Sequence, residues 1–306
     1  MNILVTGGAG FIGSHVVDAF VAAGHQVSIV DDLSSGKREY VNPEARFYQA
    51  DIRQEEIVRE IIESDRVEVI CHQAALVSVR ESMVEPLRYA SVNILGSLTL
   101  LELARKYECR RFIYASTGGA VYGEPEVLPA SEDTPINPLD CYGASKHTVE
   151  HYLYLYEKNY GLPYTALRYA NVYGPRQDPM GEAGVVAIFS GQMLAGKPVT
   201  INGSGKQVRD FVYVEDVARA NVLALSQTGS GIYNIGTGIP TDINILFAKM
   251  KAAADYPLEP NYGPPKLGEV FRIYLDNRRA REALGWEPRV DLEEGIRRTL
   301  AYFKHR

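Results

Sequence analysis

The chain has 306 residues, enough for one large core or two lobes, and its formal net charge of -6 argues against non-specific binding to nucleic acid. Its three cysteines, Cys71, Cys109 and Cys141, are odd in number and lack CxxC spacing, so we expect free thiols and no metal site. No apolar run reaches about 18 residues, and a core strand expected from residue 2 leaves no room for a signal peptide, so we expect a cytoplasmic protein without a membrane partner.

Strand-like and helix-like patterns alternate through the first half of the chain. We expect strands near residues 2–6, 26–30, 45–49, 68–72, 111–115 and 163–168. We expect helices near residues 11–23, 54–64, 85–106 and 141–160. Because continuous apolar strands that alternate with helices form parallel sheets covered on both faces, the sequence predicts an α/β fold with a Rossmann-type, doubly wound parallel sheet.

The first expected strand runs into a glycine-rich turn, Thr6-Gly-Gly-Ala-Gly-Phe-Ile-Gly13, which opens the first helix. Gly7, Gly10 and Gly13 lack Cβ atoms, so the backbone can turn tightly and approach a pyrophosphate, to which the helix presents its first N–H groups. Asp31 ends the next strand, where a carboxylate accepts hydrogen bonds from ribose hydroxyls and repels a 2′-phosphate. The segment therefore predicts an NAD site, and the alternative is an ordinary tight turn.

Tyr142 and Lys146 stand one helical turn apart at the start of the helix expected at 141–160, so their side chains share a face. A phenol, with a pKa of about 10, becomes a useful base at pH 7 only with roughly 4 kcal/mol of electrostatic help. We expect that help from the lysine ammonium and a positive nicotinamide ring. The same spacing recurs at Tyr154–Lys158, interpreted as packing, and at Tyr262–Lys266, which prolines interrupt.

After about residue 170, glycine and proline punctuate shorter elements, which suggests a smaller second lobe built from loops, short strands and helices. Loops that project from a rigid sheet are where specificity for small molecules usually lies. We therefore place the boundary between two domains at residues 1–170 and 171–306, with some later segments interleaved back into the first domain.

Further motifs follow along the chain. They are His72-Gln-Ala-Ala75, Ala115-Ser-Thr-Gly-Gly-Ala-Val-Tyr-Gly123, Arg168-Tyr-Ala-Asn-Val-Tyr-Gly-Pro175, Val208-Arg-Asp-Phe-Val-Tyr-Val-Glu-Asp216, Asn234-Ile-Gly-Thr-Gly238 and Leu284-Gly-Trp286. Together with the glycine turn and Tyr142–Lys146, they make the chain similar, from end to end, to the extended short-chain dehydrogenase/reductases. Within that group the chain most resembles the UDP-glucose (UDP-galactose) 4-epimerase family.

This resemblance implies an NAD-dependent isomerase of nucleotide-sugar and galactose metabolism. In that family a tyrosinate takes the proton from the sugar 4-OH while C4 gives its hydride to NAD, and the 4-keto sugar turns over before the hydride returns to its other face. NAD therefore stays bound. The resemblance also implies an NAD-binding domain at 1–170, a UDP-sugar-binding lobe at 171–306, and a homodimer in which the helices near 85–106 and 141–160 form a four-helix bundle.

The family usually has a serine or threonine where this chain has Gly118. We hypothesise that Thr117 supplies the missing hydroxyl, with Ser116 as its neighbour; the alternative is that Thr117 only bonds the backbone at a strand end. The following Gly119 and Ala120 replace the Asp-Glu pair of related 4,6-dehydratases and the glutamate of related UDP-glucuronate decarboxylases. Both of those reactions therefore lack their acid/base groups here.

The resemblance implies further ligand contacts. Around the cofactor, beyond the glycines, Asp31, Tyr142 and Lys146, they involve Phe11, Ile12, Asp32, Ser35, Gly36, Asp51, Ile52, Ala74, Ala75, Asn93 and Tyr169. Around the substrate they involve Val77, Ser78, Thr117, Gly118, Gly119, Asn171, Gly184, Val185, Val186, Arg209, Lys266 and Glu269. The alternatives are a plain surface turn for Asp51 and an ion pair with Asp210 for Arg209, whose fork otherwise suits a diphosphate.

The preferred sugar stays open at this point. Ile273 stands where relatives set tolerance for N-acetyl sugars and is of intermediate size, and Val77 replaces a lysine of some hexose-specific relatives. A UDP-glucuronate or UDP-N-acetylhexosamine 4-epimerase is therefore an alternative. Two other classes also stay open: a catalytically silent NAD-binding module and an oxidoreductase that releases NADH.

Overall fold

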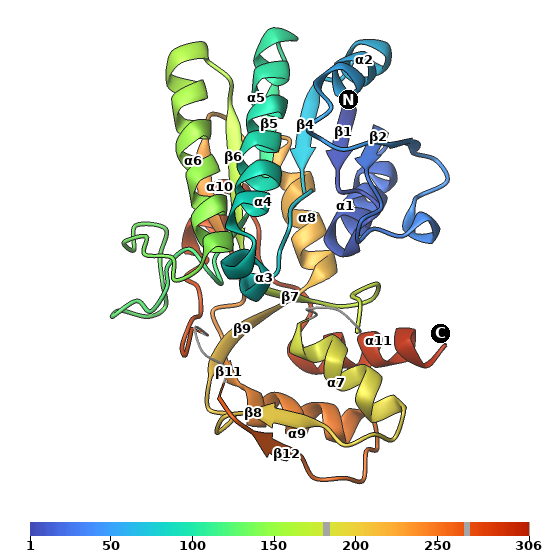
Figure 1. The fold of residues 1–306 in the computed structure, drawn as a ribbon, viewed down its shortest axis with the longest axis vertical. Helices are drawn as coiled ribbons and strands as arrows, with labels where there is room; N and C mark the ends of the chain where they lie inside the picture. Colours follow the sequence, from blue (N-terminus) through green and yellow to red (C-terminus); the bar gives the residue numbers. More distant parts are fainter. Residues whose placement is uncertain (180–183, 266–269, 306) are drawn as a thin grey trace.

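The computed structural model describes residues 1–179, 184–265 and 270–305 (Figure 1). Its largest element is a seven-stranded sheet with the strand order β10-β6-β5-β4-β1-β2-β3. Every neighbouring pair in this sheet is parallel, which confirms the predicted fold class. The strands are β1 (Asn2–Thr6), β2 (Gln26–Asp31), β3 (Arg46–Gln49), β4 (Val69–His72), β5 (Arg111–Thr117), β6 (Tyr164–Tyr169) and β10 (Gly231–Ile235).

The strands expected in the first half are present, and β5 runs two residues beyond its expected end, to Thr117. One of the two edge strands of the sheet, β10, comes from the second half of the chain and was not expected from the sequence. Its short run, Gly-Ile-Tyr-Asn-Ile, is embedded among glycines, so only its parallel pairing with β6 defines it as a sheet strand.

Helices cover both faces of the sheet (Figure 1). One face packs α1 (Phe11–Ala22), α8 (Val214–Ala224) and α10 (Arg278–Leu284) into one apolar cluster. The other face packs α2 (Glu55–Asp65), α5 (Gly96–Lys106) and α6 (Cys141–Tyr160) into a second cluster. The chain therefore buries the sheet from both sides, as continuous apolar strands require.

The helix expected at 85–106 is divided into three segments. These are α4 (Pro86–Tyr89), a π-helical turn η2 (Ala90–Leu95) and α5, and a short helix α3 (Val79–Val84) precedes them. The expected helix is therefore present, with a π-helical turn inside it that the sequence did not predict. Within η2, the Asn93 side chain accepts a hydrogen bond from the Leu76 N–H and donates one to the Leu76 carbonyl, so the wide turn anchors the loop after β4.

The rest of the second half forms a smaller lobe with its own apolar core. A three-stranded sheet contains β7 (Asn171–Tyr173), β9 (Val208–Tyr213) and β11 (Pro240–Asp242), and β8 (Thr200–Asn202) pairs with β12 (Asn261–Gly263). The helices of this lobe are α7 (Val185–Leu194), α9 (Ile243–Ala253) and α11 (Leu292–Lys304). Since β10, α8 and α10 pack with the large sheet, the second half contributes to both regions, and the division at residue 170 stays a prediction.

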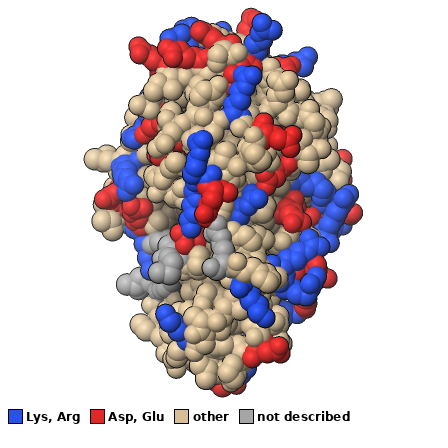
Figure 2. All heavy atoms as spheres, turned by 90° about the vertical axis from the view of Figure 1, so that its right-hand side faces the viewer, with Lys and Arg blue, Asp and Glu red and all other residues tan. Residues whose placement is uncertain are grey.

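The smaller lobe faces the carboxyl ends of the central strands (Figure 1). In open parallel sheets, ligands bind at that edge. The view in Figure 2 shows acidic and basic side chains interspersed rather than gathered into one large patch of a single sign. Among the described residues, no helix combines the length and apolarity that a bilayer crossing requires.

Candidate active site

The glycine turn after β1 lies directly against the chain that follows β4. Gly7 has a φ of +69°, and a Cβ on it would stand 2.7 Å from the Ala74 nitrogen. A Cβ on Gly13 would stand 2.0 Å from the Gly7 carbonyl oxygen. The helix α1 begins with Gly10 as its N-cap and no side-chain cap, so its first N–H groups remain for an anion. This cradle fits the pyrophosphate of a dinucleotide.

Asp31 lies beside this turn at the end of β2. Its carboxylate accepts hydrogen bonds from the N–H groups of Ala9, at 3.0 Å, and Leu33, at 2.8 Å. A Cβ on Gly36 would stand 2.7 Å from one carboxylate oxygen, so the chain closes tightly around it. Burial raises the pKa of Asp31, and each oxygen retains a lone pair that can accept from a ribose hydroxyl.

Other predicted cofactor residues lie at or near this edge of the sheet, but their surroundings do not by themselves indicate a cofactor contact. Phe11 and Ile12 open α1, and Ala74 and Ala75 follow β4. Asp32 binds the backbone and hydroxyl of Ser34, whereas Ser35 is exposed. Their contacts with the cofactor stay predictions.

Three of the predicted cofactor residues have their polar groups engaged within the protein. Asp51 forms an ion pair with Arg53 at 2.5 Å, which lowers the pKa of Asp51. Asn93 is tied to Leu76 and to Ser145, and the Tyr169 hydroxyl joins Gln73 and Asn221. Ile52 is buried where Gly96 leaves room for it. Cofactor contacts of these residues also stay predictions.

Tyr142 stands in the first turn of α6, whose N-cap Asp140 accepts a hydrogen bond from the Gly143 N–H at 2.7 Å. The Thr117 side chain, at the end of β5, hydrogen-bonds the phenol and lowers its pKa. Burial dominates, however, and raises the pKa of Tyr142 to about 12. The structure thus brings together the phenol and the hydroxyl that the sequence analysis paired.

Lys146 lies one turn further along α6 and is only 3% exposed. Its ammonium stands over the ring of Tyr114, 4.4 Å from the ring centre. Burial lowers the pKa of Lys146 to about 7, so this lysine is poised between its charged and neutral forms. Because burial raises the pKa of Tyr142, a phenolate at pH 7 needs electrostatic help in addition to the Thr117 hydrogen bond.

The hydroxyls and glycines at the end of β5 have different surroundings. Ser116 donates to Glu150 at 2.5 Å inside the protein, away from the phenol. A Cβ on Gly118 would stand 2.5 Å from a methyl group of the buried Leu275, so a side chain at position 118 would run into the core. Thr117, on the opposite face of the strand, is the hydroxyl that reaches Tyr142.

The predicted substrate residues of both regions have different surroundings. The Asn171 amide oxygen stands 3.6 Å from where a Gly119 Cβ would be, so these two residues are neighbours. Arg209 is 9% exposed and donates to the carbonyls of Val208 and Phe271. Gly184 is the N-cap of α7, next to Val185.

Five predicted substrate residues remain, and the structure describes three of them. Val186 is buried in the core of the lobe, whereas Val77 is exposed. Ser78 caps α3 through the Glu81 N–H. Lys266 and Glu269 lie outside the described residues. The substrate contacts of this whole set stay predictions.

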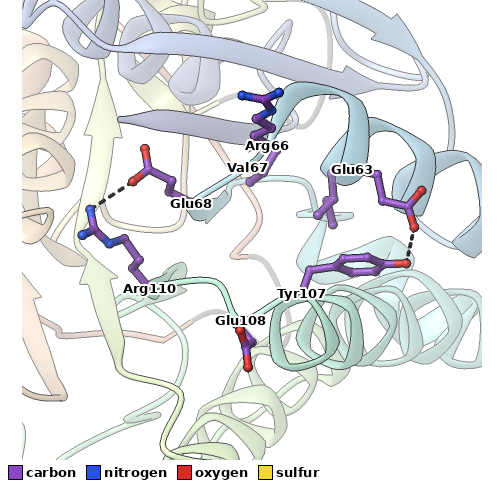
Figure 3. A pocket seen from close by; sticks show the side chains of 8 residues that line it. Glu63, Arg66, Val67, Glu68, Tyr107, Glu108 and Arg110 are labelled. Carbon is purple, nitrogen blue, oxygen red and sulfur yellow. Dashed lines mark hydrogen bonds and ion pairs between the residues drawn. The ribbon is translucent and has the colours of Figure 1, made fainter.

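Two surface hollows lie at the opposite edge of the sheet. The larger, of about 480 Å³, lies near the amino ends of β4 and β5 (Figure 3), and the smaller, of about 390 Å³, lies near the amino ends of β5 and β6. In the larger one, Arg110 pairs with Glu68 at 3.0 Å and the Tyr107 hydroxyl donates to Glu63 at 2.5 Å. Because these groups satisfy one another and lie far from the glycine turn, we do not consider the hollow to be the active site.

Three buried side chains that shape the site were not expected from the sequence. Leu275 fills the space beside Gly118, and Asp210 accepts hydrogen bonds from Thr237, Gly238 and Leu275 that hold that segment in place. Glu150 bonds Ser116 and Arg168. For Glu150 a signal was available, because it follows Lys146 at the i+4 position of the same helix.

Comparisons with known proteins agree with this geometry. The profile of the NAD dependent epimerase/dehydratase family matches residues 3–236. A putative UDP-glucose 4-epimerase of Methanocaldococcus jannaschii is 50% identical over 99% of this chain and 98% of its own length. The crystal structure of a UDP-glucose 4-epimerase from Thermotoga maritima, with UDP-glucose, has a TM-score of 0.98 at 52% identity, covering 100% of this chain and 99% of that one.

A UDP-glucose 4-epimerase from Thermus thermophilus, in complex with NAD, has a TM-score of 0.94 at 45% identity over 99% of both chains. The chain therefore belongs to the NAD-dependent epimerase/dehydratase family. Its cofactor is NAD, and the cradle around Gly7, Gly13 and Asp31 fits that cofactor.

We predict that Gly7→Ala abolishes retention of NAD, because a methyl group would collide with the Ala74 backbone and the φ of +69° disfavours it. NAD released by heat from the purified variant is the measurement. Gly24→Ala is the control: its φ is +81° with nothing within 4 Å, so it loses about 1 kcal/mol of stability but keeps NAD. Equal NAD content in both variants would contradict the steric argument.

Proposed function

We propose that the chain is an NAD-dependent UDP-glucose 4-epimerase, which interconverts UDP-glucose and UDP-galactose by inverting C4. The observation that carries the proposal is the pairing of Thr117 with Tyr142, one turn from the buried Lys146, at the same edge of the sheet as the glycine cradle. Full-length similarity to UDP-glucose 4-epimerases supports the same assignment.

In this proposal, Tyr142 removes the proton from the sugar 4-hydroxyl and returns it after the other face of C4 has been reduced. Bound NAD supplies the hydride acceptor for C4. Thr117 bonds the phenol and orients the 4-hydroxyl, and Lys146 favours the phenolate when it is charged. Asn171, Arg209, Gly184 and Val185 hold the nucleotide part, and Val186 supports them from the core of the lobe.

The same positions argue against elimination chemistry. Dehydration and decarboxylation need an acid/base group after Thr117, and positions 119 and 120 are glycine and alanine. Ala120 is buried, so no acid could be added there without disturbing the core. Epimerisation, which moves one proton and one hydride, needs only the groups that are present.

The first test is conversion of UDP-galactose to UDP-glucose by the purified protein without added NAD. We expect turnover by the wild type and a loss of about 100-fold or more in kcat for Tyr142→Phe, which removes the base. Tyr154→Phe is the matched control, because this exposed tyrosine has the same spacing to Lys158 on the same helix, and it should keep full activity.

Each other outcome identifies a different function. Conversion of UDP-glucuronate or a UDP-N-acetylhexosamine instead would assign the substrate class. The size of the Ile273 side chain does not decide which UDP-sugar is preferred, because that side chain is buried in the core. Bound NAD without any conversion would indicate a silent binding module, and accumulation of NADH would indicate an oxidoreductase.

We predict that Thr117→Ala moves the acidic limb of the kcat profile to higher pH. The phenolate is the active form, so activity rises as pH passes the pKa of Tyr142, and the Thr117 hydrogen bond lowers that pKa. Its loss raises the pKa, so that a higher pH is needed. Thr117→Ser restores the bond and should restore the profile, whereas an unshifted limb in Thr117→Ala would refute the role.

We also propose that the protein is a homodimer paired through α6 and the consecutive helical segments α4 and α5, which lie beside α6 in Figure 1. Large apolar side chains are exposed on and next to this helical layer. They are Met83, Val84, Leu87 and Leu95, between 58% and 85% exposed. Several large exposed apolar side chains on neighbouring helical segments are typical of an interface. A second copy of the chain, presenting the same helices, is the partner that this prediction requires.

The double variant Leu87→Glu/Leu95→Glu should be monomeric at micromolar concentration, because charges would be buried in the interface. Size-exclusion chromatography with light scattering measures the mass. The matched control is Ile57→Glu, an apolar residue of α2 that is 40% exposed and outside the layer, which should remain dimeric. A monomeric wild type would refute the proposal.

A further inference from the structure

A buried ionic network lies directly behind the Tyr142–Lys146 pair. Its centre is Glu150, 2% exposed, on the same helix as Lys146 and one turn further on. Its carboxylate accepts hydrogen bonds from Ser116 at 2.5 Å and from the guanidinium of Arg168 at 2.9 and 2.6 Å. The His147 ring lies 3.2 Å away. Neither the sequence motifs nor the proposed chemistry accounts for this group.

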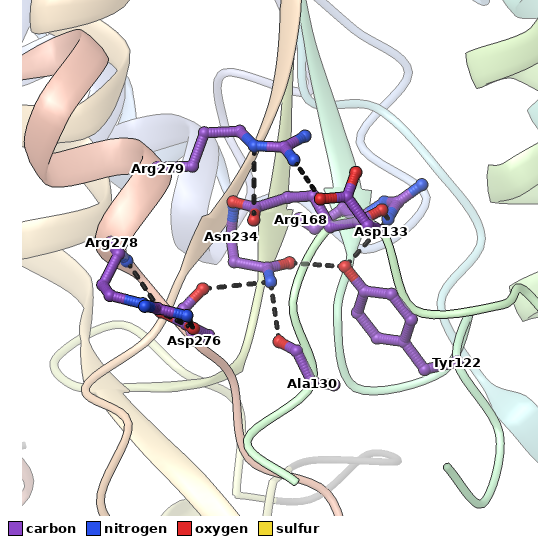
Figure 4. A network of polar contacts seen from close by, with 9 residues as sticks. Tyr122, Ala130, Asp133, Arg168, Asn234, Asp276, Arg278 and Arg279 are labelled. Atoms are coloured by element: carbon purple, nitrogen blue, oxygen red, sulfur yellow. Dashed lines mark hydrogen bonds and ion pairs between the residues drawn. The ribbon is translucent and has the colours of Figure 1, made fainter. Parts of the chain in front are cut away.

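The network extends from α6 to the far side of the sheet. Arg168 donates to the Tyr122 hydroxyl at 2.8 Å, and that hydroxyl donates to the Asn234 amide oxygen at 2.7 Å. The Asn234 amide then donates to the carbonyls of Ala130 and Asp276 (Figure 4). The backbone next to Asp276 belongs to Leu275, which fills the space beside Gly118. Residues of α6, β6, β10 and the segment around Leu275 therefore surround the end of β5.

We propose that Glu150, held by Arg168 and Ser116, is a positioning residue whose negative charge favours the ammonium form of Lys146 beside Tyr142 and whose bond to Ser116 anchors the strand end that carries Thr117. This inference rests on the proposed epimerase chemistry. Ser116 precedes Thr117 on β5, so its bond to Glu150 connects that strand end to the helix of Tyr142. Residues at i and i+4 lie about 6 Å apart on one helix face, so Glu150 and Lys146 are within electrostatic reach.

The other groups that face Lys146 do not supply a negative charge. His72 on β4 stays neutral, because burial and the lysine lower its pKa well below the ordinary value. Tyr114 on β5 offers its ring face, and Tyr142 is a phenol in the free protein. Further along α6, Glu102 on α5 bonds Tyr156. Glu150 is therefore the carboxylate that opposes the desolvation of Lys146, and it raises the pKa of that lysine.

Because Glu150 is paired with Arg168, removing either charge should shift the pKa of Lys146 in opposite directions. Glu150→Gln removes the negative charge and leaves Arg168 as an unpaired positive charge nearby, so the Lys146 ammonium is disfavoured twice. Arg168→Gln leaves Glu150 unneutralised, so the ammonium is favoured. A network with a purely structural role would move the titration of Lys146 in neither direction.

The experiment is an NMR titration of protein labelled with ¹³C at the lysine ε-carbons, with the Lys146 signal assigned by Lys146→Met. We expect the titration midpoint of Lys146 to fall by about 1 to 3 pH units in Glu150→Gln and to rise in Arg168→Gln. Arg168→Lys, which keeps the charge, should restore the wild-type midpoint. An unchanged midpoint in Glu150→Gln, or shifts of equal sign in both glutamine variants, would overturn the proposal.

If neither single variant folds, Glu150→Gln/Arg168→Gln replaces both charges and leaves none unpaired in the interior. Its Lys146 midpoint should lie below that of the wild type, and an unchanged midpoint would again overturn the proposal. The titration needs no turnover, so its result is independent of whether the protein epimerises UDP-glucose.

The sheet also supplies a matched control. At its other edge, Ser28 donates to Asp65 at 2.5 Å, and Asp65 pairs with Arg46 at 2.5 Å. This serine–acid–arginine group has the same chemistry but lies away from Tyr142. Asp65→Asn should reduce stability while leaving the Lys146 midpoint and the pH profile of kcat unchanged. A shift in this control equal to that in Glu150→Gln would overturn the specific role of Glu150.

Discussion

The parallel pairing of β1 with β2 and β4, and of β4 with β5, brings the carboxyl ends of these strands to one edge of the sheet. The glycine turn, Asp31, Ala74 and Thr117 each follow or end one of these strands. Because a Cβ at Gly7 would meet the backbone after β4, the cofactor cradle exists only while β1 and β4 are in register. The remainder of the site depends on this close approach.

Burial dominates the electrostatics at this edge. It raises the pKa values of Asp31 and Tyr142 and lowers that of Lys146, so each of these groups is shifted toward its neutral form. The family's NAD brings an anionic pyrophosphate and a positive nicotinamide ring. The protein therefore provides uncapped helix N–H groups for the pyrophosphate and a hydrogen-bonded phenol. The positive nicotinamide ring of the cofactor supplies much of the charge that would stabilise the phenolate.

The two regions of the chain are joined by polar contacts rather than by a simple linker. Asp210 of β9 holds Thr237, Gly238 and Leu275, and Leu275 lies against Gly118 at the end of β5. Asn234 of β10 adds bonds to Ala130 and Asp276. The position of Thr117 is consequently set by residues from both halves of the chain.

The sequence by itself determined the parallel α/β fold, the NAD cradle and the pairing of Tyr142 with Lys146, because short-range spacing and glycine geometry encode these features. It did not reveal the π-helical turn around Asn93, the seventh strand β10 or the reason for a glycine at 118. Those depend on contacts between residues far apart in the chain, such as Asn93 with Leu76 and Gly118 with Leu275. Only the tertiary structure decided which hydroxyl faces Tyr142, since alternation along β5 directs Thr117 to the phenol while Ser116 is held by Glu150.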